Sequence, residues 1–201
     1  MTKIKICGLS RLADVACVNK LQPDYVGFVF AKSRRQITKE HAITLRMSMG
    51  PQIQTVGVFV NELPQIVGQF AEDGIIDLVQ LHGQEDETYL HNLRYHTGAE
   101  IIQAFSIKSA ADIQRANKSS ADYVLVDSGV GGTGQQFDWS LLEGMERPYF
   151  LAGGLNAGNV EKAIAAVHPF AVDISSGVET EGIKDPVKIE ECIRRIKDVR
   201  E

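Results

Sequence analysis

Short apolar segments recur along this chain at a nearly constant interval. They begin between 22 and 29 residues apart and cover Lys3–Gly8, Tyr25–Phe30, Gln54–Val60, Leu78–Gly83, Ile101–Ile107, Tyr123–Ser128, Pro148–Gly154 and Ala171–Gly177. Each has the length and the apolar, β-branched content of a buried strand. Stretches between them show helical periodicity, as in residues 189–196, where apolar side chains follow an i, i+3, i+4, i+7 pattern. The chain is therefore predicted to alternate strands and helices.

Eight strand–helix units at one period indicate a closed (β/α)8, or TIM, barrel, because a doubly wound open sheet rarely needs so many regular units. Ser10, Thr38 and Asp185, which is followed by Pro186, are typical residues for the starts of helices. With 201 residues, the chain lies at the lower size limit of this fold. We expect residues 1–201 to form a single barrel domain of minimal length.

Composition and charge argue against several classes of partner and site for such a barrel. The formal net charge of -5 and the lack of a basic run argue against nucleic acid. No apolar run reaches the ~20 residues of a membrane span, and no signal peptide opens the chain. The three cysteines, Cys7, Cys17 and Cys192, are too few for a disulfide framework, and none lies at metal-ligand spacing. We expect a cytoplasmic protein, either a monomer or a homodimer.

Active sites of this fold lie at the carboxyl ends of the strands, so each strand end is a candidate. In the first strand, alternation predicts that Ile4 and Ile6 pack against the helices and that Cys7 points into the barrel mouth. Cys7 could act as a base if nearby positive charge lowers its pKa, or it could be a small buried hydrophobe. Lys5 shares the inward face and is expected to form an internal ion pair.

The sixth strand ends on an acid, Asp127, directly before the glycine-dense stretch 128–134. This stretch lacks the spacing of a dinucleotide-binding G-x-G-x-x-G motif. A carboxyl group at this position could donate a proton, or it could cap a helix or order a loop. Cys7 and Asp127 lie on strands five apart in order, so we expect them to face each other across the barrel mouth as a base and an acid.

Small residues follow the last two strands, where barrels of this kind commonly bind phosphate. Gly153 and Gly154 end the seventh predicted strand, and Ser175 and Ser176 end the eighth. Backbone N–H groups and hydroxyls there could hold a phosphate, although a tight turn and a helix cap are the alternatives. The pattern predicts a small phosphorylated substrate. Two other strand ends carry polar residues. His82, after the fourth strand, shares an inward face with Gln80 and is expected to be structural. Arg34 and Arg35, after the second strand, could hold a carboxylate.

Taken together, the strand ends resemble those of the phosphoribosylanthranilate isomerases, enzymes of tryptophan biosynthesis. The matching segments span nearly the whole chain in order: Lys5–Gly8, Gly27–Phe30, Ser33 with Arg35, Val56–Phe59, Gln80–Gly83, Asp127 with Gly131–Gly134 and Phe137–Trp139, Leu151–Leu155 and Asp173–Glu179. The resemblance implies an Amadori rearrangement of N-(5-phosphoribosyl)anthranilate that needs neither a metal nor an organic cofactor.

The resemblance also implies a role for each candidate residue. Asp127 would be the general acid and Cys7 the general base. Arg35 would hold the anthranilate carboxylate, although Arg34 beside it leaves open which arginine does so. The phosphate would lie on the residues after the seventh and eighth strands, with Asp173 lining the site: Gly153, Gly154, Ser175 and Ser176.

Two rival functions follow from the same fold. One is the isomerase of histidine biosynthesis, which runs the same chemistry on a bulkier substrate but is expected to carry an acid where Cys7 stands. The other is a non-catalytic barrel that binds phosphorylated ligands, which predicts a damaged acid–base pair. Because Cys7 and Asp127 are both present, the phosphoribosylanthranilate isomerase interpretation is favoured.

Overall fold

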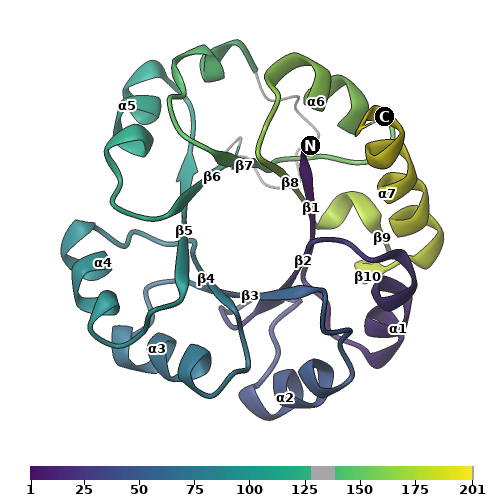
Figure 1. Ribbon diagram of the computed structural model, residues 1–201, viewed down its shortest axis with the longest axis horizontal. Helices are drawn as coiled ribbons and strands as arrows, with labels where there is room; N and C mark the ends of the chain where they lie inside the picture. The colour runs from purple at the N-terminus through teal and green to yellow at the C-terminus, as the bar shows by residue number, and fades with distance from the viewer. Residues whose placement is uncertain (128–138, 201) are drawn as a thin grey trace.

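The computed structural model describes residues 1–127 and 139–200, and in these residues eight parallel strands close into a barrel. Each strand pairs with the next along the chain, and β8 pairs with β1 to complete the ring (Figure 1). The strands are β1 (Lys3–Cys7), β2 (Tyr25–Val29), β3 (Gln54–Phe59), β4 (Leu78–Leu81), β5 (Glu100–Ser106), β6 (Tyr123–Asp127), β7 (Tyr149–Leu151) and β8 (Ala171–Ile174). The predicted barrel is confirmed.

Helices form an outer ring around the strands (Figure 1). They are α1 (Leu12–Leu21), α2 (Lys39–Met47), α3 (Pro64–Glu72), α4 (Glu87–Arg94), α5 (Ala110–Lys118), α6 (Val160–Val167) and α7 (Pro186–Arg200). The described part of the connection from β6 to β7 holds the 3-10 helix η1 (Trp139–Gly144) instead of an α-helix. Pro148 follows closely and cannot continue a helix, which favours a short 3-10 turn. None of the helices described is long and apolar enough to cross a membrane.

Two of the predicted helix starts have different outcomes. Thr38 is the N-cap of α2, and its side chain accepts a hydrogen bond from the backbone N–H of His41 at 3.2 Å. Ser10 was predicted to cap the first helix, but the N-cap of α1 is Arg11. The carboxylate of Asp14 explains the difference, because it accepts both the Ser10 and the Arg11 backbone N–H groups at 3.1 and 3.0 Å.

Alternation along the strands divides the core into two parts. Inside the barrel lies one apolar cluster, which consists of Tyr25, Val56, Leu78, Ile102, Leu125, Phe150, Ala152 and Ala171. Aromatic rings and Lys3 close its amino-terminal end, where Lys3 Nζ donates to the Tyr25 hydroxyl at 3.0 Å and lies 5.1 Å from the Phe170 ring centre. The carboxyl end is therefore the end at which a site is open.

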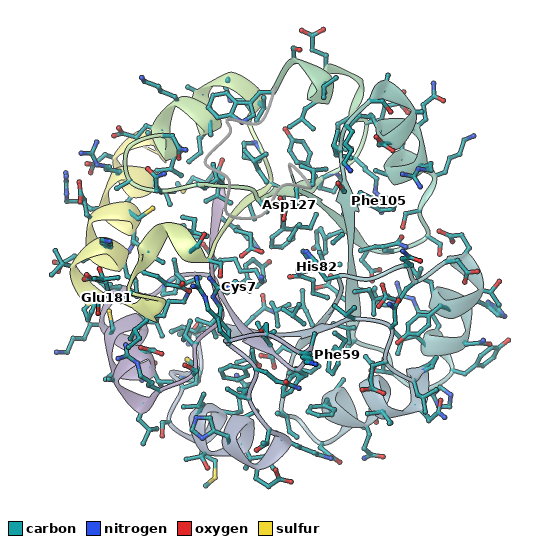
Figure 2. The ribbon with its side chains drawn as sticks, turned by 180° about the vertical axis from the view of Figure 1, so that it is seen from behind. Cys7, Phe59, His82, Phe105, Asp127 and Glu181 are labelled. Atoms are coloured by element: carbon teal, nitrogen blue, oxygen red, sulfur yellow. The ribbon has the colours of Figure 1, made fainter. Side chains whose placement is uncertain are left out.

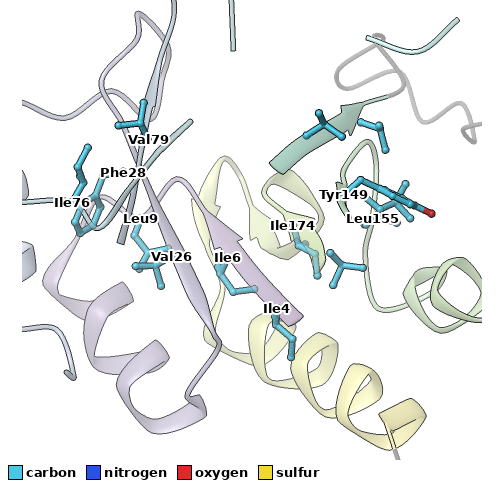
Figure 3. Close-up of a cluster of buried hydrophobic side chains, with 14 of the residues drawn as sticks. Ile4, Ile6, Leu9, Val26, Phe28, Ile76, Val79, Tyr149, Leu155 and Ile174 are labelled. Atoms are coloured by element: carbon cyan, nitrogen blue, oxygen red, sulfur yellow. The ribbon is translucent and has the colours of Figure 1, made fainter. Parts of the chain in front are cut away.

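The larger part of the core lies between the barrel and its helices. Ile4 and Ile6 are fully buried there, as predicted, and Figure 3 shows both side chains beside α7. With Ile4 and Ile6 outward, Lys5 and Cys7 must face the interior of the barrel.

The last two strands end earlier than the sequence predicts. β7 stops at Leu151 because Gly153 and Gly154 adopt positive φ values of 91° and 68°, which a strand cannot contain. After β8, residues Ser176–Val178 form the 3-10 helix η2. An unpredicted hairpin follows, in which β9 (Glu179–Thr180) pairs antiparallel with β10 (Ile183–Lys184). These irregular segments border the mouth of the barrel.

Candidate active site

A cavity of about 620 Å³ opens at the carboxyl ends of the strands. All the residues that were predicted from the sequence to form the site line this cavity: Cys7, Arg35, Asp127, Gly153, Gly154, Asp173, Ser175 and Ser176. Other lining residues, including Val58, Gln80 and His82, come from the strands on the far side from β7 and β8. The glycine-dense stretch 128–134 lies outside the described residues.

Cys7 ends β1, and Asp127 ends β6. Figure 2 shows both side chains, with His82, around the centre of the barrel. In the closed ring the shorter path between the two strands runs through β7 and β8, so Cys7 and Asp127 are not at opposite poles as the strand order suggested. A substrate held by the loops after β7 and β8 would lie between them.

Lys5 forms the internal ion pair that the sequence predicts. Its ammonium lies 2.9 Å from Oδ2 of Asp173, and the Lys5 side chain is completely buried. The parallel register places Lys5 directly beside Asp173 on β8. Burial by itself lowers the pKa of Lys5, but the negative charge of Asp173 and its hydrogen bond outweigh this effect and raise that pKa. Lys5 is therefore a permanent positive charge beneath the site.

Two opposing effects act on the thiol of Cys7, whose ionisation the sequence left open. Burial raises the pKa of Cys7, and the nearby ammonium of Lys5 opposes this shift without overcoming it. In the free protein, burial thus favours the neutral thiol of Cys7 over its thiolate. Gly27 on β2 makes room for it, since a Cβ at that position would lie 2.6 Å from Cys7 Sγ. The thiol thus has a tightly defined place at the cavity wall.

A second charged cluster, which the sequence did not predict, lies beside Cys7 and is centred on Glu179. Arg35 donates to this carboxylate from Nε at 2.6 Å and from Nη2 at 2.8 Å. Arg34 and Lys184 add single contacts at 2.8 and 2.7 Å. Burial alone would raise the pKa of Glu179, but hydrogen bonds from Arg35 and Lys184 bring it below its ordinary range.

Three cationic side chains around one carboxylate leave this corner of the cavity positive. Arg35 is the arginine with the fixed position, because it binds Glu179 through two donors and its side chain is 21% exposed, against 59% for Arg34. The aliphatic part of the Arg35 side chain packs over Gly8, where a Cβ atom would lie only 2.5 Å from Arg35 Cδ. The corner suits an anionic group of a ligand.

The loops after β7 and β8 pack closely against each other. A Cβ at Gly177 would lie 1.9 Å from the backbone oxygen of Leu155, so only glycine fits there. The hydroxyl of Ser175 donates to the carbonyl of Cys7 at 3.1 Å, which ties the end of β8 to the end of β1. The loops thus place Gly153, Gly154 and Ser176 along one edge of the cavity.

Gln80 and His82 form a hydrogen-bonded pair on the β4 side of the cavity. The distance from Gln80 Nε2 to His82 Nδ1 is 3.0 Å, and His82 is exposed in the cavity rather than buried. Among the residues described, no group of three or more His, Cys, Asp or Glu side chains converges as a metal site.

Comparison with known proteins adds a family to this geometry. A family model described as N-(5'phosphoribosyl)anthranilate (PRA) isomerase matches residues 4–195. The N-(5'-phosphoribosyl)anthranilate isomerase of Thermoanaerobacter pseudethanolicus is 44% identical over 206 residues, which cover 100% of both chains.

Solved structures agree. The crystal structure of phosphoribosyl anthranilate isomerase from Thermotoga maritima has a TM-score of 0.88 at 37% identity, covering 98% of this chain and 100% of that one. A crystal structure of such an isomerase in complex with reduced 1-(o-carboxyphenylamino)-1-deoxyribulose 5-phosphate has a TM-score of 0.85 at 36% identity, with the same coverage.

Proposed function

This chain belongs to the N-(5'-phosphoribosyl)anthranilate isomerase family, and we propose that Cys7 and Asp127 are the base and the acid of its reaction. The enzyme converts N-(5'-phosphoribosyl)anthranilate into 1-(2-carboxyphenylamino)-1-deoxyribulose 5-phosphate in tryptophan biosynthesis. The observation that carries the proposed roles is that one cavity joins Cys7, Asp127 and the loops after β7 and β8.

The proposed mechanism moves protons without any change of oxidation state overall. Asp127 gives its proton to the ribose ring oxygen, the C1–O bond breaks, and the C1–N bond becomes a Schiff base. Cys7 first loses its thiol proton to solvent, and the thiolate then removes the proton from C2 to form an enolamine. The enolamine hydroxyl then gives its proton to the Asp127 carboxylate, and the Cys7 thiol gives its proton to C1, which yields the ketone and restores Asp127 as an acid. Lys5, fixed beneath the site, offsets part of the thiolate's charge.

We assign the phosphate to the loops after β7 and β8, on Gly153, Gly154, Ser175 and Ser176. Positive φ values at both glycines and the close approach of Gly177 to Leu155 support this assignment, because they expose backbone at the cavity edge. The Ser175 hydroxyl already donates to Cys7, so its contact with phosphate would come from the backbone N–H.

We assign the anthranilate carboxylate to Arg35. Glu179 occupies Nε and Nη2 of Arg35, which leaves the Nη1 donors for the substrate. Asp173 lines the same cavity on β8 and is assigned to the sugar.

Glu179→Gln should raise KM for phosphoribosylanthranilate roughly tenfold and leave kcat close to that of the wild type. The amide keeps the shape of the side chain but loses one charged contact to Arg35, and such contacts are worth about 1.5–3 kcal/mol. Steady-state kinetics measure the split between KM and kcat.

Arg34→Ala is the matched control, because Arg34 is exposed and binds Glu179 through one donor. With phosphoribosylaniline, which lacks the carboxylate, the Glu179 variant and the wild type should have equal KM values. A Glu179 variant that loses kcat with KM unchanged would contradict the assignment of Arg35.

Complementation distinguishes this enzyme from the histidine-pathway isomerase. The chain is expected to restore growth of a tryptophan auxotroph that lacks this step, and not of the matching histidine auxotroph. Turnover of phosphoribosylanthranilate by purified protein is the direct measurement. Rescue of the histidine strain alone would overturn the proposed substrate.

The remaining proposals concern the whole molecule. The strands β1 to β8 close one ring and helix α7 follows them, which supports residues 1–201 as one (β/α)8 domain. We place the enzyme in the cytoplasm, where a reducing medium suits its free cysteines, Cys7, Cys17 and Cys192. We expect a monomer or a homodimer, since the related enzyme from Thermotoga maritima is dimeric and has also been crystallised as monomers generated from the dimer. Light scattering would measure the mass in solution.

A further inference from the structure

Gln80 is buried near the end of β4, and one of its polar atoms lacks a partner within the part of the chain that the structure describes. Gln80 is only 1% exposed to solvent, yet it lines the cavity. The oxygen Oε1 has no hydrogen-bond donor among the residues described. An unpaired buried acceptor costs about 1–3 kcal/mol, so native proteins rarely keep one without a reason. An acceptor of this kind on a cavity wall indicates a donor on the ligand.

His82 fixes the direction of this acceptor. Gln80 Nε2, which can only donate a hydrogen bond, lies 3.0 Å from Nδ1 of His82. The Gln80 oxygen is therefore held away from His82.

The closed barrel shows which part of the substrate reaches Gln80. In a ring of eight strands, β4 lies four positions from β8 in either direction. With the phosphate on the loops after β7 and β8, the anthranilate half must extend toward β2, β3 and β4. That wall carries Val29, Val58 and Val60, which suit an aromatic ring.

The anthranilate half of the substrate offers one kind of hydrogen-bond donor. Its carboxylate only accepts, and the hydroxyls belong to the sugar. The nitrogen between ribose and ring carries an N–H, and this nitrogen becomes positive in the Schiff base. The second unpaired acceptor, Oδ1 of Asp173, lies on the β8 wall, near the sugar.

We propose that Gln80 Oε1 accepts a hydrogen bond from the substrate nitrogen and stabilises it when the Schiff base forms. This inference rests on the proposed function and adds to it a residue that contacts the reacting atoms. A carbonyl dipole aimed at a developing positive charge binds the Schiff base more strongly than the neutral amine, so its effect falls mainly on kcat.

Gln80→Met keeps the length of the side chain and removes the acceptor. We expect kcat to fall roughly 10- to 100-fold, as for the loss of one hydrogen bond to a charged group, with a smaller change in KM. The free energy of unfolding should fall less than when a fully hydrogen-bonded buried glutamine is replaced, because here the substitution removes an unpaired polar atom.

Gln103→Met on β5 is the matched control. Gln103 is also buried, at 7% exposed, but both ends of its amide are paired, Nε2 with the Glu85 carbonyl at 2.7 Å and Oε1 with the Ser119 hydroxyl at 2.5 Å. It does not line the cavity. This variant should lose stability in urea and keep the kinetics of the wild type, the reverse of the pattern for Gln80→Met.

Calorimetric titration identifies the donor. Reduced 1-(o-carboxyphenylamino)-1-deoxyribulose 5-phosphate should bind Gln80→Met more weakly than wild type, whereas its N-methyl form should bind both proteins equally. Weaker binding of the N-methyl form by Gln80→Met would assign a hydroxyl as the donor and overturn the proposal. Unchanged kcat in Gln80→Met with active wild type would also overturn it. An inactive wild type would instead refute the proposed function.

Discussion

Cys7→Ala and Asp127→Asn are each expected to lower kcat by ~10²–10⁴-fold, the usual range for the loss of a general acid or base. Alanine has no group that can take the C2 proton, and the amide of asparagine cannot protonate the ring oxygen. Initial rates with phosphoribosylanthranilate measure both effects. Because one proton must enter and one must leave in the same reaction, the double variant should lose less than the product of the two single losses.

Cys7→Ser is the control for packing around β1. The hydroxyl occupies nearly the same space beside Gly27 but is a far weaker acid than the thiol, so it should lose about as much activity as alanine. Circular dichroism and urea titrations should show that each variant keeps its fold. Turnover at the wild-type rate by Cys7→Ala or by Asp127→Asn would remove that residue from the mechanism.

The sequence predicted where strands begin better than where they end. β1 and β8 start at the predicted residues, Lys3 and Ala171, because apolar alternation marks entry into the barrel. The predicted end of the seventh strand ran on to Gly154, since a glycine with positive φ looks the same in sequence as one within a strand. The helix predicted after β6 is a 3-10 turn in the described residues, which the nearby Pro148 could have indicated.

The positions of the candidate site residues at the strand ends could be predicted, because the fold brings those ends together. Cys7, Asp127 and Asp173 all line the cavity as expected. The cluster around Glu179 was missed, because its contact with Arg35 joins residues 144 positions apart and no local pattern encodes it. The balance of burial and charge at Cys7 also depends on the folded environment, so the direction of its pKa shift could not be read from the sequence.

Lys5→Met is expected to destabilise the fold by about 3–5 kcal/mol, because it leaves the buried carboxylate of Asp173 without its ion-pair partner. The other oxygen of Asp173 has no partner among the described residues, so no local donor is in place to compensate. Urea unfolding measures the loss. Raised salt should change it little, since both side chains are screened from solvent.

The pH dependence and a double variant separate charge from packing. Folding raises the pKa of Lys5, so the stability from its charge is complete below the unfolded lysine value of ~10.4 and is lost only as pH rises through the folded value. The destabilisation in Lys5→Met should therefore be equal at pH 6 and pH 8.

Adding Asp173→Leu to Lys5→Met should recover most of the stability, because an apolar pair replaces a buried ion pair at little cost. Activity should stay low, since Asp173 lines the cavity. A single variant as stable as the wild type would show that the pair contributes nothing to folding.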